Sequence, residues 1–393
     1  MESLAEKYKF SRQVFEILGT YFSESRIESI VSALKRPPKR YYFRVNTVKT
    51  PPHRVIERLK QSYGVEVGQH AIFEEAIYVH VEGPFDVADH DSRVVADKFA
   101  AESVMLGANL YAPGVLKVVN AEKGDIVTVT DVFGQKVANG VLVMEKKDIF
   151  SKRRGLAVAV TVSRYRTISL RETAEYGRGL IYDQSLPSMH ASRELAPKPG
   201  ELVVDMCAAP GGKATHIAQL CPKAKVLAVD RSRPKVERLL SNIRRLGLSN
   251  VEVLLHDSRY LGVDFPNLKA DKVLLDPPCS ASGVRPKLFY TMSRKALLSL
   301  VEYQRQLLRA ARDILKPGGL LVYSTCSIFR EENEENVRYA VEELGFEQAE
   351  ITYKLASHGL KEPGIDEKCT QRYYPDVNSD SPGFFIAKLV KPS

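Results

Sequence analysis

The sequence predicts an α/β protein: a C-terminal Rossmann-like domain with a doubly wound sheet, and an N-terminal α+β region interrupted by a small β-barrel. Three observations support this fold class. After Gly200, apolar runs alternate with amphipathic helical patterns. Residues 87–162 are rich in valine and carry closely spaced turn signals. Residues 10–34 have apolar side chains at helical spacing.

In the N-terminal region, the pattern in residues 10–34 predicts two short helices that end at Pro37 and Pro38. A strand, a helix opened by proline, and a second strand should then follow, over residues 41–48, 51–64 and 76–83. These few elements do not complete a sheet. We therefore expect the α+β region to continue after the barrel.

The barrel segment centres on the strand-rich stretch "VLKVVNAEKGDIVTVTDVFGQKVANGVLVM". At its end, residues 146–171 contain eight Lys or Arg residues and a single acidic residue, Asp148. One interpretation is a solvated, charged linker. The other is a surface that follows the phosphates of a nucleic acid.

The strands of the Rossmann-like domain are predicted from five apolar runs, namely "LVVDM", "KVLAVD", "VEVLLH", "KVLLD" and "LLVYST". Helical patterns occupy residues 213–220, 233–247 and 294–315 between them. We therefore predict four parts of the chain, with boundaries at 1–87 (helical and α+β), 88–165 (barrel), 166–200 (remainder of the α+β region) and 201–393 (Rossmann-like domain).

The composition of the chain limits the kinds of partner that we expect. The chain has 393 residues and a net charge of +9, which favours a polyanionic partner without choosing between nucleic acid and a membrane. No leader-like segment follows Met1 and no 18 apolar residues run together, so we expect a cytoplasmic protein with no membrane partner. The five cysteines show no C-x-x-C spacing, so we expect reduced thiols and no metal site.

The turn "VVDMCAAPGGKA" (203–214) joins the first of these strands to a helix. A phosphate-binding loop would need glycine at Cys207 and Ser or Thr at Ala214, and the spacing of Gly211 and Gly212 does not fit a dinucleotide fingerprint. The turn therefore indicates a close backbone approach to a small polar ligand, with Asp205 at the strand end.

Acidic residues end four successive strands of the predicted sheet. Asp230 is placed to accept the hydroxyls of a ribose, Asp257 an adenine amino group, and Asp276 ends the fourth strand. A single aspartate of this kind is more often a helix cap, but caps alone do not explain four at one sheet edge. The pattern indicates a nucleoside ligand with a cationic or amino end, and S-adenosylmethionine fits it.

Two thiols follow neighbouring strands. Cys279 comes after the fourth strand and Cys326 after the fifth, so both should face one crevice. Buried, inert cysteines are the alternative. The chemistry of pyrimidines favours a reactive pair, because carbon 5 becomes nucleophilic only after a group such as a thiolate adds at carbon 6. An acid must also stabilise nitrogen 3, for which Asp276 is placed, and Lys213 or a helix N-terminus could lower a thiol pKa.

Five motifs together closely resemble the Nol/Nop/Sun family of RNA 5-methylcytosine methyltransferases: "RVNT", "DMCAAPGGKA", "DPPCSASG", "YSTCS" and "RYYPD…PGFFIAK". The resemblance covers nearly the whole chain. It implies a class I methyltransferase domain that uses S-adenosylmethionine, with Cys326 as the nucleophile and Cys279 assisting product release. It also implies that Lys213 and Asp276 act on the base. The cofactor residues that it implies are Cys207, Ala208, Ala209, Pro210, Gly211, Gly212, Lys213, Asp230, Lys235, Asp257 and Asp276.

The stretch "VMLGANLYAPGV" (104–115) resembles the signature of PUA domains, which are small RNA-binding pseudobarrels, although plain barrel turns would read similarly. An inserted PUA domain resembles one branch of the family, the tRNA methyltransferases that modify the acceptor-stem cytosine at position 72. The resemblance implies that the PUA domain holds the CCA end of tRNA and that Tyr111 contacts it. RNA-binding residues are expected at Gly107, Tyr111, Lys152, Arg153 and Arg154.

Two other functions fit the sequence. The same chemistry could act on ribosomal RNA, or the fold could serve a non-catalytic RNA-binding or ribosome-assembly factor. The presence of Cys279, Cys326, Asp276 and Lys213 disfavours the second. We expect a tRNA cytosine-5 methyltransferase that acts as a monomer.

Overall fold

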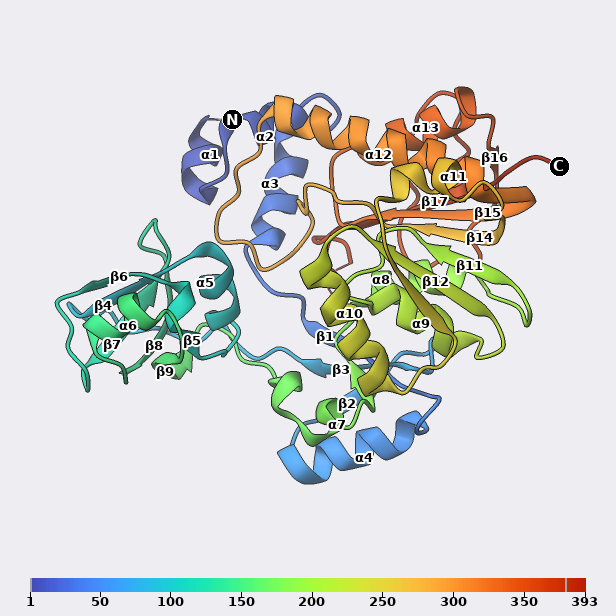
Figure 1. The fold of residues 1–393 in the computed structure, drawn as a ribbon. Coiled ribbons are helices and arrows are strands. Elements are labelled where there is room, and N and C mark those ends of the chain that lie inside the picture. Colours follow the sequence, from blue (N-terminus) through green and yellow to red (C-terminus); the bar gives the residue numbers. More distant parts are fainter. Residues whose placement is uncertain (1, 379) are drawn as a thin grey trace. The chain divides into compact units, whose positions relative to one another are not determined.

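The computed structural model describes residues 2–378 and 380–393, whose packing divides the chain into two compact units. The first contains the chain up to Tyr41 together with Val79–Ser169 and Arg285–Thr291. The second contains Tyr42–Tyr78, Leu170–Val284 and Met292–Ser393. Figure 1 shows the elements of both along the chain.

The first unit combines N-terminal helices with the barrel. The helices are α1 (Glu2–Tyr8), α2 (Arg12–Leu18) and α3 (Glu24–Leu34). The barrel sheet has the strand order β5-β9-β8-β7-β4-β6. Its elements are β4 (Arg93–Ala96), α5 (Lys98–Val104), β5 (Leu110–Tyr111), β6 (Val115–Val119), β7 (Ile126–Thr130), β8 (Lys136–Leu142), α6 (Lys146–Lys152) and β9 (Leu156–Ser163). Alternating valines of these strands form its core, which confirms the predicted barrel.

The N-terminal helices and the segment Arg285–Thr291 pack with the barrel, a grouping that sequence boundaries did not suggest. Leu288 is buried in the barrel core, and its carbonyl oxygen accepts a hydrogen bond from Gln135 Nε2 (3.0 Å). The backbone N–H of Ser11 donates to the carbonyl of Tyr290 (2.8 Å). A short segment from within the Rossmann-like sequence is therefore part of the barrel unit, because the apolar side chain of Leu288 is buried in the barrel core.

The small α+β region is completed by a strand that follows the barrel, as its unfinished sequence indicated. Its sheet has the order β10-β1-β3-β2, with strands β1 (Arg40–Val45), β2 (Val67–Gln69), β3 (Ala76–His80) and β10 (Ile181–Tyr182). Helix α4 (Pro52–Tyr63) begins with proline and ends at Gly64 in the left-handed conformation. Helices α7 (Ala174–Gly177) and α8 (Leu186–Glu194) lead into the large sheet.

The large sheet has the order β13-β12-β11-β14-β15-β18-β16, with β17 beside β18. Its first five strands are parallel: β11 (Leu202–Asp205), β12 (Lys225–Asp230), β13 (Val251–Leu255), β14 (Ala270–Leu275) and β15 (Leu315–Thr325). The last three pair antiparallel: β16 (Glu347–Gln348), β17 (Thr370–Tyr373) and β18 (Phe384–Val390). This arrangement confirms the doubly wound sheet and gives it an antiparallel edge.

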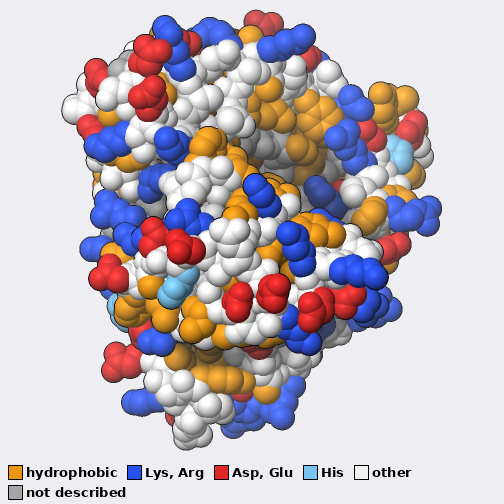
Figure 2. All heavy atoms as spheres, turned by 90° about the vertical axis from the view of Figure 1, so that its left-hand side faces the viewer, with side chains coloured by type: hydrophobic (Ala, Val, Ile, Leu, Met, Phe, Trp, Pro, Cys, Tyr) orange, Lys and Arg blue, Asp and Glu red, His pale blue; other side chains and the backbone are white. Residues whose placement is uncertain are grey.

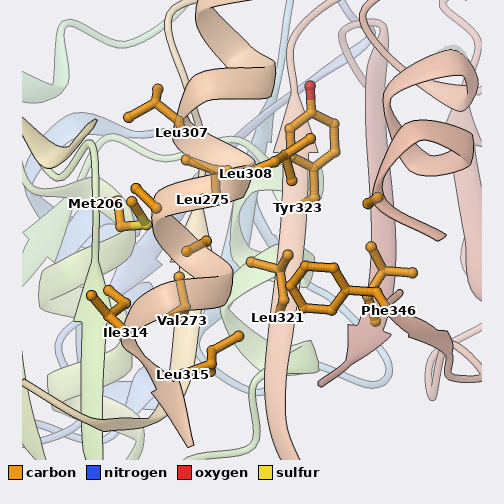
Figure 3. Packing of buried hydrophobic residues seen from close by; sticks show 14 of the residues in the cluster. Met206, Val273, Leu275, Leu307, Leu308, Ile314, Leu315, Leu321, Tyr323 and Phe346 are labelled. Carbon is orange, nitrogen blue, oxygen red and sulfur yellow. The ribbon is translucent and has the colours of Figure 1, made fainter. Parts of the chain in front are cut away.

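Helices cover both faces of this sheet (Figure 1). Helices α8, α9 (Gly212–Leu220) and α10 (Arg233–Leu246) pack on one face. Helices α11 (Leu261–Asp264), α12 (Arg294–Ile314) and α13 (Glu334–Glu342) pack on the other. Figure 3 shows that second core, in which Leu308 of α12 lies near Leu275 and Tyr323 of the sheet, and Ile314 lies near Val273. These cores fix the strand ends that carry the polar residues.

The surface is strongly charged. On the face drawn in Figure 2, Lys and Arg side chains lie among acidic and hydrophobic ones. Within the described residues, no helix is long and apolar enough to cross a membrane.

Candidate active site

The predicted acidic residues gather at one edge of the large sheet. Asp205 and Asp230 end the adjacent strands β11 and β12, and Asp276 directly follows β14. Since β12, β11, β14 and β15 are neighbours in the sheet, their carboxyl ends meet at the same edge. This edge opens into two cavities that share Cys207, Ala209 and Asp276.

The first cavity has a volume of about 360 Å³ and brings together most of the predicted chemistry. From the predicted set it is lined by Cys207, Ala209, Asp230, Lys235, Asp276, Cys279 and Cys326. The second, of about 230 Å³, is lined by the turn after β11 and by Lys213. The predicted residues there are Cys207, Ala208, Ala209, Pro210, Gly212, Lys213 and Asp276.

Gly211 lines neither cavity, and its role is in the backbone. It precedes helix α9 with φ of 114°, a conformation that side chains rarely adopt. A Cβ built at this position would lie 2.8 Å from Leu239 Cδ1. Glycine therefore allows the turn to close against α10.

Asp230 is held in place by the backbone. Its Oδ1 accepts a hydrogen bond from Ser232 N (2.9 Å), and its Oδ2 accepts one from Ala209 N (3.3 Å). Asp230 also lines the first cavity. A carboxylate so oriented can accept two further hydroxyl hydrogen bonds.

Asp257 is arranged differently from the expectation. It caps a short 3₁₀ turn, its carboxylate lies 2.8 Å from Arg259 Nη2, and it is not among the residues that line the two cavities. The guanidinium fork matches both carboxylate oxygens, which explains why this pair forms. The neighbouring side chains His256 and Ser258, together with Tyr303, line the first cavity at this point.

Lys213 and Asp276 form an ion pair beside the thiols. Lys213 Nζ lies 2.6 Å from Asp276 Oδ2, and Ser324 Oγ donates to Asp276 Oδ1 (2.9 Å). Burial alone would lower the pKa of Lys213, but the charges of Asp276 and Asp205 outweigh burial, so this pKa lies above its ordinary value. Lys213 is therefore a firmly held cation in the crevice.

Asp205 is almost completely buried, at 1% exposure. Burial is the main reason that the pKa of its carboxyl rises to about 7, and the nearby charge of Asp276 adds to it. Asp205 can therefore hold a proton near neutral pH.

The two thiols meet although 47 positions separate them in the chain. Cys279 Sγ and Cys326 Sγ are 3.3 Å apart, and both cysteines are half-buried and unbridged. The hydrogen bond with Cys326, burial, and the charges of Cys326 and Glu332 raise the pKa of the Cys279 thiol well above its ordinary range. Cys279 therefore stays protonated in the resting site.

Three groups near the site escaped the sequence analysis. Arg44, of the motif "RVNT", is completely buried and donates hydrogen bonds to Gln184 Oε1 (2.6 Å), Gly212 O (2.7 Å) and Thr215 Oγ1 (2.8 Å). Tyr303 lines the first cavity from α12. The loop before α8 lines the second cavity. The motif "RVNT" was a visible signal, but nothing local indicates what Arg44 touches.

The predicted RNA-binding residues lie in the barrel unit. They differ in exposure and in the bonds that they make within the protein. Tyr111 ends β5 and is 52% exposed, and Gly107 has φ of 102°. Lys152 pairs with Asp148 (3.0 Å), whereas Arg154 is exposed. Arg153 Nη1 and Nη2 donate to the carbonyls of Val115 (2.9 Å) and Pro113 (2.7 Å).

The basic segment is therefore not a linker. Residues 146–152 form helix α6 and residues 156–163 form strand β9, so most of the segment is part of the barrel. Arg153 fixes the turn that follows Tyr111. The interpretation as a charged linker was wrong, because the apolar face of β9 belongs to the barrel core.

Comparisons with known proteins agree with this architecture. The family described as "16S rRNA methyltransferase RsmB/F" matches residues 192–390, and the PUA domain matches residues 92–163. The tRNA (cytosine(72)-C(5))-methyltransferase of Pyrococcus horikoshii is 41% identical over 389 residues, covering 97% of each chain. The human protein named tRNA (cytosine(72)-C(5))-methyltransferase NSUN6 is 30% identical, covering 100% of this chain and 97% of that protein.

A solved structure is similar over the whole length. The crystal structure of NSun6 from Pyrococcus horikoshii with SFG superposes with a TM-score of 0.91 at 40% identity, covering 98% of this chain and 99% of that one. The agreement in sequence motifs, domain order and fold leads to one conclusion. The chain belongs to the RsmB/F (Nol/Nop/Sun) methyltransferase family, in the branch that carries a PUA domain.

Proposed function

We propose that this protein transfers a methyl group from S-adenosylmethionine to carbon 5 of the cytosine at position 72 of tRNA. The observation that carries the proposal is the pair of thiols, 3.3 Å apart, beside the Lys213–Asp276 ion pair. Methylation of an exocyclic amine needs no such pair, whereas methylation of carbon 5 needs a nucleophile and a means of releasing it.

The first cavity fits the cofactor. Asp230 offers free acceptor positions for a ribose, and Met206 and Tyr303 provide apolar surface for a base. Lys235 lines the same cavity, and the backbone of the 207–213 turn approaches from the second cavity. S-adenosylmethionine, when bound, supplies an electrophilic methyl group.

Cys326 opens the reaction. Its thiolate adds to carbon 6 of the cytosine, so that a carbon–sulfur bond forms and the electrons of the 5,6 double bond become available at carbon 5. Lys213 is a cation in the same crevice, and its charge interacts with that of the Cys326 thiolate.

Asp276 acts on the base. Charge that develops on the ring at nitrogen 3 needs a proton or a hydrogen-bond donor. Lys213 Nζ donates to Asp276 Oδ2 (2.6 Å) and Ser324 Oγ donates to Asp276 Oδ1 (2.9 Å), so the carboxylate is held in one orientation. Asp276 can pass the proton released by the Cys326 thiol to nitrogen 3, while Lys213 holds Asp276 in place.

Cys279 completes the reaction. After methylation, Cys279 gives its proton to Cys326 Sγ as the bond between that sulfur and carbon 6 breaks, and the Cys279 sulfur takes the proton that leaves carbon 5 as the 5,6 double bond forms again. Cys279 Sγ is in hydrogen-bond contact with that sulfur and carries a proton at rest. It can therefore give its proton to the departing thiolate and accept one in exchange.

The exposed residues of the barrel unit are suited to contact RNA. Tyr111 offers an exposed ring on which a base of the single-stranded CCA end can stack, and the exposed Arg154 and Lys152 can lie near phosphates. Position 72 belongs to the terminal base pair of the acceptor stem, where extruding a base is least costly. Binding of the adjacent tail would place this base reproducibly.

Methylation of tRNA transcripts tests the proposal. Unmodified transcripts would be incubated with the protein and S-adenosylmethionine, and 5-methylcytosine would be mapped by mass spectrometry of nuclease fragments. We expect one modified cytosine, at position 72, and none when uridine replaces it. Removal of the CCA end should slow the reaction by about 5- to 150-fold, as expected if stacking worth about 1–3 kcal/mol is lost.

Modification at another tRNA position, or of ribosomal RNA in preference to tRNA, would contradict the proposed substrate. An unchanged rate without the CCA end would contradict the proposed role of the barrel. We also propose that the protein acts as a monomer in the cytoplasm. Light scattering during size-exclusion chromatography tests the first part, and cell fractionation tests the second.

A further inference from the structure

Cys279 lies in the loop after β14, and Cys326 lies in the loop after β15. These two cysteine loops are joined by a network of hydrogen bonds that the reaction above does not use. The backbone N–H of Gly283 donates to the carbonyl of Cys326 (2.9 Å). Three buried hydroxyls form a triangle between the loops: Ser280 Oγ lies 3.0 Å from Ser282 Oγ and 3.1 Å from Ser327 Oγ, and Ser282 Oγ lies 3.1 Å from Ser327 Oγ. These hydrogen bonds join the two loops to each other.

Glu332 holds the loop of Cys279. Its Oε1 accepts hydrogen bonds from the backbone N–H of Ser280 (2.9 Å) and from Gln304 Nε2 (2.8 Å). Gln304 Nε2 also donates to the carbonyl of Pro278 (3.0 Å). The residues on both sides of Cys279 are thus fixed through Glu332 and its partner.

Asn333, the next residue in the chain, holds the loop of Cys326. Its Oδ1 accepts a hydrogen bond from Thr325 Oγ1 (2.5 Å), and its Nδ2 donates to the carbonyl of Ser327 (3.0 Å). Thr325 and Ser327 flank Cys326. Two consecutive side chains therefore hold the two cysteine loops, one each.

The pair is anchored to the core beneath the site. The carbonyl oxygen of Glu332 accepts a hydrogen bond from the hydroxyl of Tyr323 (2.6 Å), whose ring belongs to the cluster in Figure 3. Glu332 and Asn333 are completely buried, and Glu332 Oε2 has no hydrogen-bond partner among the described residues. A buried carboxylate with an unpaired oxygen costs folding free energy, so stability alone does not explain its presence.

We propose that Glu332 and Asn333 are positioning residues for the two-cysteine reaction: Glu332 places Cys279 for release, and Asn333 places Cys326 for attack. This inference rests on the proposed function. Because each side chain holds only one loop, replacing either should impair a different half of the reaction, although the two residues are neighbours.

The experiment compares Glu332→Ala with Asn333→Ala, using full-length protein, S-adenosylmethionine and unmodified tRNA. Covalent protein–RNA adduct is measured on denaturing gels, and methylated product is measured in the same samples. Glu332→Ala should still form the adduct but release it at least 10-fold more slowly, so that adduct accumulates. Asn333→Ala should form the adduct at least 10-fold more slowly, with little accumulation.

Controls separate positioning from folding. Glu332→Gln keeps an oxygen that can accept from Ser280 N–H, so it should restore release toward the wild-type rate. Glu194→Gln changes a carboxylate that is equally buried but bonded to His190 and to the backbone of Thr352 and Tyr353. This variant should alter thermal stability without adduct accumulation. Binding of S-adenosylmethionine, measured by calorimetry, identifies variants that fold.

Parallel loss of attack and release in both alanine variants would overturn the inference, as would wild-type kinetics in both. Failure of Glu332→Gln to restore release would also contradict it. Cys279→Ala and Cys326→Ala are measured alongside. If neither affects the adduct, the proposed function itself fails. If Cys279→Ala accumulates adduct and Cys326→Ala forms none, but Glu332→Ala and Asn333→Ala do not differ, only the positioning roles are rejected.

Discussion

The cysteine crevice and the predicted RNA-binding surface of the barrel are built in opposite ways. In the crevice, Lys213 is 12% exposed and is held by Asp276, and both thiols are half-buried. On the barrel, Tyr111 is 52% exposed and Arg154 is exposed. Buried groups with fixed partners suit bond formation, which tolerates little misplacement, whereas exposed rings and cations suit a flexible RNA tail. Substitutions in the crevice should therefore have larger effects.

The largest effect is expected from Asp276→Asn. The amide can neither pass a proton to nitrogen 3 nor form an ion pair with Lys213, so turnover at saturating RNA should fall by about 10²- to 10⁴-fold. The matched control is Asp271→Asn. Asp271 lies near the start of the same strand, at the opposite end from Asp276, and its carboxylate pairs with Lys316 (2.6 Å). Equal loss in both variants, measured in single-turnover methylation assays, would show that strand stability and not proton transfer to nitrogen 3 is responsible.

A smaller but distinct effect is expected from Asp205→Asn. Burial raises the pKa of Asp205 to about 7, whereas an aspartate in the unfolded chain titrates near about 4. Between these values the folded protein holds a proton that the unfolded chain has lost, so the free energy of unfolding falls as pH rises from about 4 to about 7. Urea denaturation across this range should show a shallower decline for Asp205→Asn than for the wild type. An identical decline of the free energy of unfolding in both proteins would show that a group other than Asp205 titrates in this range.

Arg44→Met tests the support beneath the crevice. The change removes three hydrogen bonds of a buried guanidinium and leaves Gln184 Oε1 and Gly212 O without this donor, so we expect a loss of about 3 kcal/mol in the free energy of unfolding. Arg154→Met on the barrel should change it by less than about 0.5 kcal/mol. Similar losses for both arginines in urea denaturation would remove the distinction between the two regions.

The smallest effect is expected on the barrel itself. Tyr111→Ala should weaken tRNA binding by about 1–3 kcal/mol, and Tyr111→Phe should bind as the wild type does, because stacking needs the ring and not the hydroxyl. Fluorescence anisotropy with labelled tRNA measures both. Loss of binding in Tyr111→Phe would indicate that the hydroxyl makes the contact.

Sequence reasoning reached the fold and most of the site because the relevant residues follow apolar strands. Asp205, Asp230, Asp276, Cys279 and Cys326 each lie at or just beyond a recognisable strand end, and parallel strands bring such ends together. The convergence of two distant thiols could be inferred for the same reason. Their assignment to attack and release came from the family resemblance.

The remaining features depend on long-range packing that no local pattern encodes. Arg44 meets Gln184 and Gly212 only after three separate segments have folded together. Asp257 was expected to face the ligand, but Arg259, two residues later, reaches its carboxylate. Arg153 was expected to contact RNA, yet both terminal nitrogens of its guanidinium hold backbone carbonyls. In each case a competing partner decides where the side chain lies.

The most direct measurement follows the covalent adduct formed by Cys279→Ala with tRNA and S-adenosylmethionine. Mass spectrometry of the trapped complex should find Cys326 joined to the cytosine at position 72, and the double variant Cys279→Ala/Cys326→Ala should form no adduct. Normal turnover by Cys279→Ala, or an adduct through a residue other than Cys326, would contradict the division of labour between the two thiols.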